Sequence, residues 1–181
     1  MTLARADDTS FKGHFLVATP KLGDPMFGRA VILLLEHDDR GALGIIINRA
    51  TKTPVARVFP LPAEARQRSD RVFVGGPVQP KRIFVLLRAT EAPPAANAVL
   101  PDVYISTRQP AFDHAFKNDW PVNRVRVIAG YAGWSAGQLE NEVKRGDWRF
   151  YPADAKFVFD APPARLWEVL NALTRGQWAK L

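Results

Sequence analysis

Runs of apolar residues along the chain predict a protein made mainly of β-strands. The two longest runs, residues 29–37 and 42–48, flank the polar sequence DDRG at residues 38–41, which predicts a hairpin with a four-residue loop. Both runs are too apolar to leave one face in water, so we expect them to be central strands. Further short strands are predicted at residues 11–20, 71–74, 82–87, 103–106, 124–129, 148–151 and 156–159.

Apolar side chains at a spacing of three and four residues predict the helices. These are expected at residues 53–58, 110–117, 136–145 and 160–176. The apolar stripe of the last helix is predicted to consist of Leu166, Val169, Leu170 and Leu173, widened by Trp167, and Gly176 is expected to end this helix. Residues 91–101, rich in alanine and proline, are predicted to form a surface loop.

The stretch around which the chain is organised begins with the predicted strand at residues 124–129. A glycine-rich turn is expected to follow it, in which Gly130 and Gly133 bracket Tyr131 and Trp134. Two large rings are thereby placed on a backbone that is free to adopt unusual dihedral angles.

A helix is predicted directly after this turn. Ser135 and Gln138 have the spacing of a capping box, in which the serine hydroxyl accepts the Gln138 amide and the glutamine side chain reaches back to the Ser135 amide. We therefore expect Ser135 to cap the helix and Gly146 to end it.

Residues 133–137 also match the pattern G-x-S-x-G of a hydrolase nucleophile elbow. In that fold the histidine base follows the serine in the chain, whereas His14, His37 and His114 all precede Ser135. A cap is therefore the favoured interpretation of Ser135, and a small-molecule hydrolase that uses Ser135 is kept as an alternative.

Composition favours one globular domain in the cytosol. The chain has 181 residues, of which 47% are hydrophobic, and it contains no cysteine, which excludes disulfides and thiol chemistry within it. We expect a flexible segment at residues 1–10 and a single domain at residues 11–181. The first residues lack the apolar stretch of a signal peptide, and no run is long enough to span a bilayer, so no membrane association is predicted.

The formal net charge of +7 permits binding to nucleic acid or to acidic molecules. The basic residues are scattered, and the nearest approach to a cluster is at residues 66–71, followed by Lys81 and Arg82. No nucleic-acid recognition motif organises them. A solvated basic surface is therefore favoured, and direct nucleic-acid binding is kept as an alternative.

Strands of mixed length with few crossover helices favour an α+β fold over a doubly wound α/β sheet. A sheet of about eight strands in one domain tends to curl, and the glycines would allow the bends. We therefore predict a mixed, strongly bent sheet that is flanked by a few helices.

Short motifs that follow one another along the chain are typical of one family. They lie at residues 13–20, 24–27, 36–37, 41–48, 72–78 and 130–140, and read GHFLVATP, DPMF, EH, GALGIIIN, VFVGGPV and GYAGWSAGQLE. Their order and spacing resemble the AlgH/YqgE proteins, a bacterial family of largely uncharacterised biochemical function. The resemblance implies a cytosolic α+β domain with a bifurcated sheet folded into a pseudo-barrel. One member gives the family its name through an effect on alginate production, and a label as transcriptional regulator rests on that effect.

Glycine-rich turns are the predicted place for a ligand, because their backbone amides can bind an anion. The candidate ligand-binding residues are Asn48, Gly75, Gly76, Gly130, Tyr131, Gly133, Trp134, Gln138 and Glu140. Bends in a curled sheet explain the glycines equally well. The histidines lack metal-ligand spacing, so neither a metal site nor a cofactor is predicted.

No complete catalytic set is present in the sequence, which favours a protein that is not an enzyme. The leading hypothesis is a cytosolic binding or regulatory protein that acts through a small-molecule or protein partner.

Overall fold

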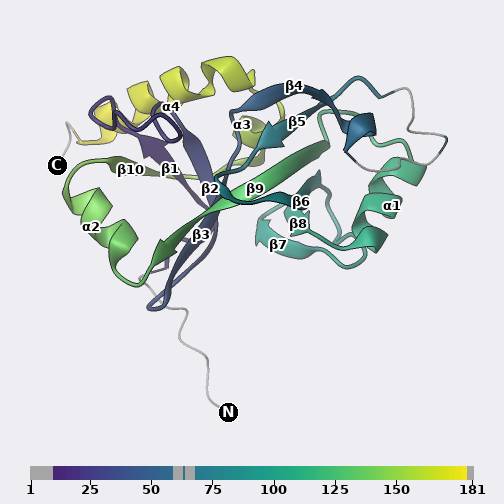
Figure 1. Cartoon of the computed structure of the whole chain (residues 1–181), viewed down its shortest axis with the longest axis horizontal. Helices are drawn as coiled ribbons and strands as arrows, with labels where there is room; N and C mark the ends of the chain where they lie inside the picture. Colours follow the sequence, from purple (N-terminus) through teal and green to yellow (C-terminus); the bar gives the residue numbers. More distant parts are fainter. Residues whose placement is uncertain (1–9, 59–62, 64–67, 179–181) are drawn as a thin grey trace, which may run out of the picture.

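The computed structural model describes residues 10–58, 63 and 68–178 (Figure 1). Apart from Ser10, the predicted flexible segment at residues 1–10 lies outside the described residues, as do residues 66–67 of the basic stretch. The division into this segment and one domain at residues 11–181 stays a prediction.

Strands dominate the described part of the chain. In chain order, the elements are β1 (His14–Ala18), β2 (Val31–Asp38), β3 (Gly41–Ile46), β4 (Ala50–Pro54), the 3-10 helix η1 (Val55–Arg57), β5 (Arg71–Val74), β6 (Val78–Arg88), β7 (Asn97–Leu100), β8 (Val103–Ser106), α1 (Gln109–Lys117), β9 (Val125–Ser135), α2 (Gln138–Lys144), β10 (Trp148–Pro152), α3 (Ala155–Phe159) and α4 (Pro163–Trp178). The α+β class is therefore confirmed.

Strand β9 lies at a fork of the sheet and runs through the middle of the molecule, from the side of α1 to the side of α2 (Figure 1). Its first half, residues 125–129, pairs antiparallel with β6 and parallel with β5. Its second half, residues 132–135, pairs with β3. Gly130 separates the halves and has a φ of 75°, a left-handed conformation that glycine adopts without strain. The sheet is therefore mixed and splits into two branches at Gly130.

The curl of the sheet brings its two ends together. The strand order is β10-β1-β2-β3-β9-β6-β8-β7. Strand β7, at one end, approaches the residues that lead into β1, because a Cβ on Gly13 would lie only 3.0 Å from the Val99 carbonyl oxygen. The sheet thus forms a pseudo-barrel, as the predicted bend requires.

Strand β2 shows why the central strands are apolar on both faces. Val31, Leu33 and Leu35 contribute to the core cluster inside the curl, whereas Ile32 and Leu34 contribute to a second cluster that α2 covers. A third cluster lies under α1 at the far end of the molecule. Because neither face of β2 meets water, the strand carries no polar alternation over its first five residues.

The β2–β3 hairpin is tighter than predicted. Asp38 pairs with Gly41, so only residues 39–40 form the loop. The Asp38 carboxylate accepts hydrogen bonds from the Arg40 backbone amide at 2.9 Å and from the Arg40 guanidinium at 2.7 Å. The prediction of a four-residue loop was wrong because this local bonding lets both flanking residues join the ladder.

The predicted turn at residues 130–133 is also wrong, since β9 continues through it to Ser135. Pairing of Gly133 with Leu43 and of Trp134 with Ala42 satisfies the backbone in extended form. Ser135 pairs with Gly41 as the last residue of β9, and among the described residues no side chain caps the start of α2.

The residue that caps α2 is Gly137, with a φ of 72°. Half of the predicted capping box is present, because the Ser135 amide donates to Gln138 Oε1 at 3.0 Å. The predicted end of the helix is confirmed: Gly146 has a φ of 81° and donates its amide to the Val143 carbonyl at 2.9 Å.

Two predictions of local structure fail near the sheet edges. Residues 156–159 form α3 and not a strand, because the Asp154 carboxylate accepts the Lys156 amide at 2.8 Å and starts a helix. The predicted loop at residues 91–101 contains the edge strand β7, and the edge strand β4 was not predicted. Edge strands have a weak periodic signal because one side of their backbone has no partner strand.

The apolar stripe of α4 is rotated relative to the prediction. Leu166 and Leu170 are buried, but Val169 and Leu173 are 44% and 41% exposed. The helix also continues past Gly176 to Trp178. The indole of Trp167 donates to the Ala18 carbonyl at 2.7 Å, and this contact sets which face of α4 meets β1.

Candidate functional site

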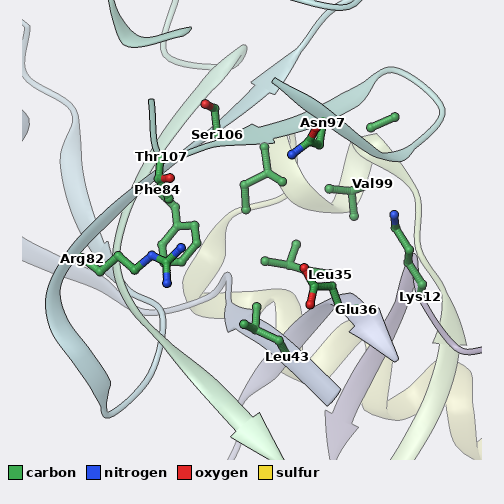
Figure 2. Close-up of a pocket in the computed structure, with 12 residues that line it drawn as sticks. Lys12, Leu35, Glu36, Leu43, Arg82, Phe84, Asn97, Val99, Ser106 and Thr107 are labelled. Atoms are coloured by element: carbon green, nitrogen blue, oxygen red, sulfur yellow. The ribbon is translucent and has the colours of Figure 1, made fainter. Parts of the chain in front are cut away.

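A cleft of about 490 Å³ opens at one end of the pseudo-barrel, and we call it the mouth (Figure 2). It is bounded by β2, β3, β6, β7, β8 and the residues before β1, so strands from both branches of the sheet contribute to it. Its lining residues are Lys12, Leu35, Glu36, Leu43, Arg82, Phe84, Asn97, Ala98, Val99, Ile105, Ser106 and Thr107. Barrel mouths are among the usual places for small-molecule sites.

The floor of the mouth consists of apolar side chains that belong to the core cluster inside the curl. Leu35, Phe84 and Val99 are buried, with 6%, 5% and 8% of their surfaces exposed, and Leu43 and Ile105 pack against them. A ligand in the mouth would therefore rest on apolar side chains that the fold holds in place.

Irregularities in the strands build this floor and its rim. In β2 the pairing with β3 shifts between Leu34 and Glu36, so the strand bulges at Leu35. The bulge lets the consecutive residues Leu35 and Glu36 both face the mouth, where a regular strand would present only one of them. A similar shift in β7, between Ala98 and Leu100, accompanies the three consecutive β7 residues in the lining.

Three charged side chains surround the opening. Arg82 and Lys12 lie on opposite sides of it, and the carboxylate of Glu36 points into it between them (Figure 2). Among the described residues, none of these three side chains has a hydrogen bond within 3.5 Å or an ion pair within 4.0 Å. Charged groups left unpaired around an apolar floor are available to a ligand.

Aromatic rings support Arg82 at the rim. Its guanidinium carbon lies 5.3 Å from the centre of the Phe84 ring and 5.9 Å from that of Tyr131. The two rings contact each other edge to face at 6.2 Å. These cation–π contacts orient the guanidinium without using any of its N–H donors.

The neutral polar residues of the rim differ in whether their side chains are already hydrogen-bonded within the protein. Ser106 donates its hydroxyl to the Ala95 carbonyl at 2.7 Å and accepts the Arg108 amide at 3.0 Å, so it serves the loop around it. The side chains of Asn97 and Thr107 have no such bond within the described part of the chain. They are the neutral hydrogen-bonding groups that a ligand can reach.

A buried histidine holds the segment that carries Lys12. The Phe11 backbone amide donates to His37 Nδ1 at 3.2 Å, which fixes the proton of this imidazole on Nε2. Nε2 then donates to Glu140 Oε1 at 2.9 Å. The side chain of His37 is only 8% exposed, and it anchors Phe11 and α2 to β2.

The pKa of Glu140 lies below its ordinary value of 4.5. The largest cause is a hydrogen bond to its carboxylate from its own backbone amide; burial acts in the opposite direction, and the bond from His37 lowers the pKa further. Its other oxygen, Oε2, is buried without a hydrogen-bond partner. The ionised form of Glu140 is therefore favoured in the folded protein.

Comparison with known proteins identifies the family. The profile of the AlgH-like family matches residues 15–179. The chain belongs to the AlgH-like family. A UPF0301 protein of Myxococcus xanthus (strain DK1622) is 40% identical over 156 residues, which cover 84% of each chain. A UPF0301 protein of Chromobacterium violaceum is 35% identical over 171 residues, 92% of this chain and 91% of its own.

Solved structures agree with the family and the fold. The solution structure of the AlgH protein from Pseudomonas aeruginosa has a TM-score of 0.76 and 32% sequence identity, over 96% of this chain and 93% of that one. A crystal structure of a Corynebacterium diphtheriae protein has a TM-score of 0.72 over 87% of this chain and 84% of its own, but at 23% identity it supports the fold alone. The resemblance inferred from the motifs is thus confirmed. The names of these relatives state a family and no reaction.

At three of the four predicted glycines of this AlgH-like protein, an added Cβ atom would collide with backbone atoms. A Cβ on Gly75 would collide with the Gly130 carbonyl, and one on Gly76 would collide with Tyr131. A Cβ on Gly130 would lie 2.5 Å from the Gly76 carbonyl oxygen. These three glycines allow the close crossing at the fork, and ligand binding through them stays a prediction. Gly133 has no comparable restriction, because its Cβ would meet only the Tyr131 ring at 3.7 Å.

Asn48 lies away from the mouth and joins two strands. Its Oδ1 accepts the Val31 amide at 2.9 Å, and its Nδ2 donates to the Arg29 carbonyl at 3.0 Å. Both ends of the amide are thus used to connect the end of β3 to the start of β2.

Trp134 and Gln138 meet at Glu142, which was not predicted. Glu142 Oε2 accepts the indole N–H groups of Trp134 and Trp148, each at 2.9 Å, and Oε1 accepts the Gln138 amide at 3.0 Å. The spacing of Gln138 and Glu142, four residues apart on a helix, was the available signal, but only the tertiary structure brings Trp148 to them.

None of the predicted site residues is among those that line the mouth, but Tyr131 contacts Arg82 and Phe84 at its rim. Sequence reasoning missed Lys12 and Glu36, and it noted Arg82 only within a scattered basic pair. Glu36 lies in the short motif at residues 36–37, but no motif joins these three residues, because they come from separate segments that the curl of the sheet brings together.

Other kinds of site find no support in the described part of the chain. It contains no group of three or more metal-ligating side chains. None of the three histidines makes a hydrogen bond with Ser135 within the described residues. Within the same residues, no helix is both long and apolar enough to cross a membrane.

Proposed function

We propose that this AlgH-like protein is a non-enzymatic binding protein whose mouth takes a small acidic molecule with an apolar part. The observation that carries the proposal is the pair of unpaired cations, Arg82 and Lys12, at the rim of a cleft with an apolar floor. The protein would act in the cytosol. Any regulatory role, including one in transcription, would depend on whether the mouth holds its ligand.

Arg82 is the main anion-binding group of the proposed site. A guanidinium offers a planar fork of donors that matches a carboxylate or phosphate, and its stacking on Phe84 and Tyr131 reduces the freedom lost on binding. Lys12 adds a more mobile point charge on the opposite side. Burial of the ligand's apolar part against Leu35 and Val99 contributes about 25 cal/mol for each Å² removed from water.

The distribution of the other cations disfavours a nucleic-acid surface. Many basic side chains are bound to carboxylates of the same chain, as in Arg29–Glu168, Arg40–Asp38, Arg68–Asp70, Arg88–Asp160, Arg145–Asp147 and Lys156–Asp154. Arg124 stacks on Trp120 at 4.1 Å. Each of these pairs removes one cation from direct contact with phosphates, although it leaves the net charge of +7 unchanged.

Isothermal titration calorimetry with N-acetyl-glutamyl-leucine tests the proposal, because this probe has two carboxylates and an apolar side chain. We expect binding that weakens about tenfold in Arg82→Gln, as expected for the loss of a charge-assisted hydrogen bond. The matched control is Arg57→Gln, which removes an exposed arginine of η1 outside the mouth and should leave the affinity unchanged.

Equal weakening in both variants would mean that net charge alone attracts the probe, and it would refute binding at the mouth. No binding to the wild-type protein by this probe or by its free-amine form would refute the proposed function itself.

A further inference from the structure

Glu36 distinguishes the mouth from a simple anion site. Its carboxylate points into the opening between Arg82 and Lys12 (Figure 2) and has no ion pair within 4.0 Å among the described residues. Asp38, on the same hairpin, differs in this respect because Arg40 holds its carboxylate at 2.7 Å. A free carboxylate in this place would repel a ligand that carries only negative charge.

We infer that the ligand of the mouth is zwitterionic: it carries an ammonium group that pairs with Glu36 and carboxylates that pair with Arg82 and Lys12. This inference rests on the proposed function and narrows its ligand class to an amino acid-like or short peptide-like molecule with an acidic group. The same ligand would place an apolar side chain on the floor formed by Leu35, Phe84 and Val99.

Charge complementarity gives the ligand its expected pattern. The mouth presents a cation, an anion and a cation, which sum to +1, so the complementary ligand presents a carboxylate, an ammonium and a carboxylate, which sum to −1. A phosphate ester or a plain dicarboxylate lacks the central cation and would leave Glu36 next to like charge. Glu36 thus acts as the group that selects among acidic molecules.

The fold places Glu36 in this role through the bulge in β2. Because the strand bulges at Leu35, Glu36 turns to the mouth while His37 turns to α2 and bonds Glu140. His37 in turn fixes the Phe11 amide, which precedes Lys12. One short segment of β2 therefore supplies the anion of the site, part of its apolar floor and the anchor for one of its cations.

The test compares the dipeptide glutamyl-leucine with its N-acetyl form, which has the same carboxylates and side chain but no ammonium group. Calorimetry at pH about 6.5 keeps the dipeptide amine protonated, since an α-amino group has a pKa of about 7.7–8.0. Each probe is titrated into the wild-type protein, into Glu36→Gln, and into Glu91→Gln, which removes an exposed carboxylate of the loop before β7 outside the mouth.

We expect the free amine to bind the wild-type protein about tenfold more tightly than the acetylated form. Glu36→Gln should remove this preference, so that the two probes bind alike, whereas Glu91→Gln should retain it. The coupling between acetylation and the Glu36 substitution is the decisive quantity, because it cancels any general effect of either change.

Two results would overturn the inference and are distinguishable from failure of the proposed function. If both probes bind the wild-type protein with equal affinity, or if the preference persists in Glu36→Gln, the mouth binds acids without recognising an ammonium group, and the proposed function stands. If neither probe binds, the proposed function and the inference fail together.

Discussion

Replacement of Gly130 by alanine tests whether the fork of the sheet depends on close backbone approach. At a φ of 75° an alanine is held in the left-handed backbone conformation, which lowers the stability of the folded protein by about 1–2 kcal/mol. Its Cβ would lie 2.5 Å from the Gly76 carbonyl oxygen, a backbone atom that cannot rotate away. Crowding of this kind costs a further 1–3 kcal/mol or so. The free energy of unfolding should therefore fall by about 2–5 kcal/mol.

Gly137→Ala is the matched control for backbone strain. Gly137 has a φ of 72°, but nothing lies within 4 Å of its Cβ position, so the variant should lose only about 1–2 kcal/mol. Gly133→Ala, with neither strain nor crowding, should change stability by less than about 0.5 kcal/mol. Any gain from a less flexible unfolded chain occurs in all three variants and cancels in the comparison.

Urea unfolding followed by tryptophan fluorescence measures these differences, with the slope of the transition as a check that the unfolded state is unchanged. If Gly130→Ala and Gly137→Ala lose the same free energy within about 0.5 kcal/mol, the fork tolerates a side chain and the reasoning from close approach is refuted.

Two further predictions concern α4 and α2. Leu170→Ala should reduce the free energy of unfolding by about 2–5 kcal/mol and Leu173→Ala by less than about 1 kcal/mol, since Leu170 is fully buried and Leu173 is 41% exposed; equal losses in urea unfolding would contradict the orientation of α4. Because the folded-state pKa of Glu140 is lowered from 4.5, its stabilising effect is present above pH about 4.5 and is lost as the pH falls through the folded-state pKa. Glu140→Gln should therefore show a smaller drop in urea midpoint than the wild-type protein between pH about 6 and 3, and an equal drop would contradict this.

The sequence alone determined where most strands and helices lie. Apolar runs as long as those of β2 and β3 have no stable place except between two covering layers, and the helical spacing of apolar residues in α1 has one interpretation. The ordered motifs were sufficient for the family, because their spacing spans nearly the whole chain.

Tertiary structure decided the remainder, because the deciding partners are distant in the chain. Pairing with β3 kept residues 132–135 extended where local glycines predicted a turn, and contact with Ala18 oriented α4 through Trp167. The mouth also depends on segments that are distant in the chain. A bulge at Leu35 turns Glu36 inward, and the curl of the sheet brings Glu36 near Arg82 and Lys12. Local patterns encode the face of a regular strand, but bulges, curl and long-range pairing arise only when the whole sheet forms.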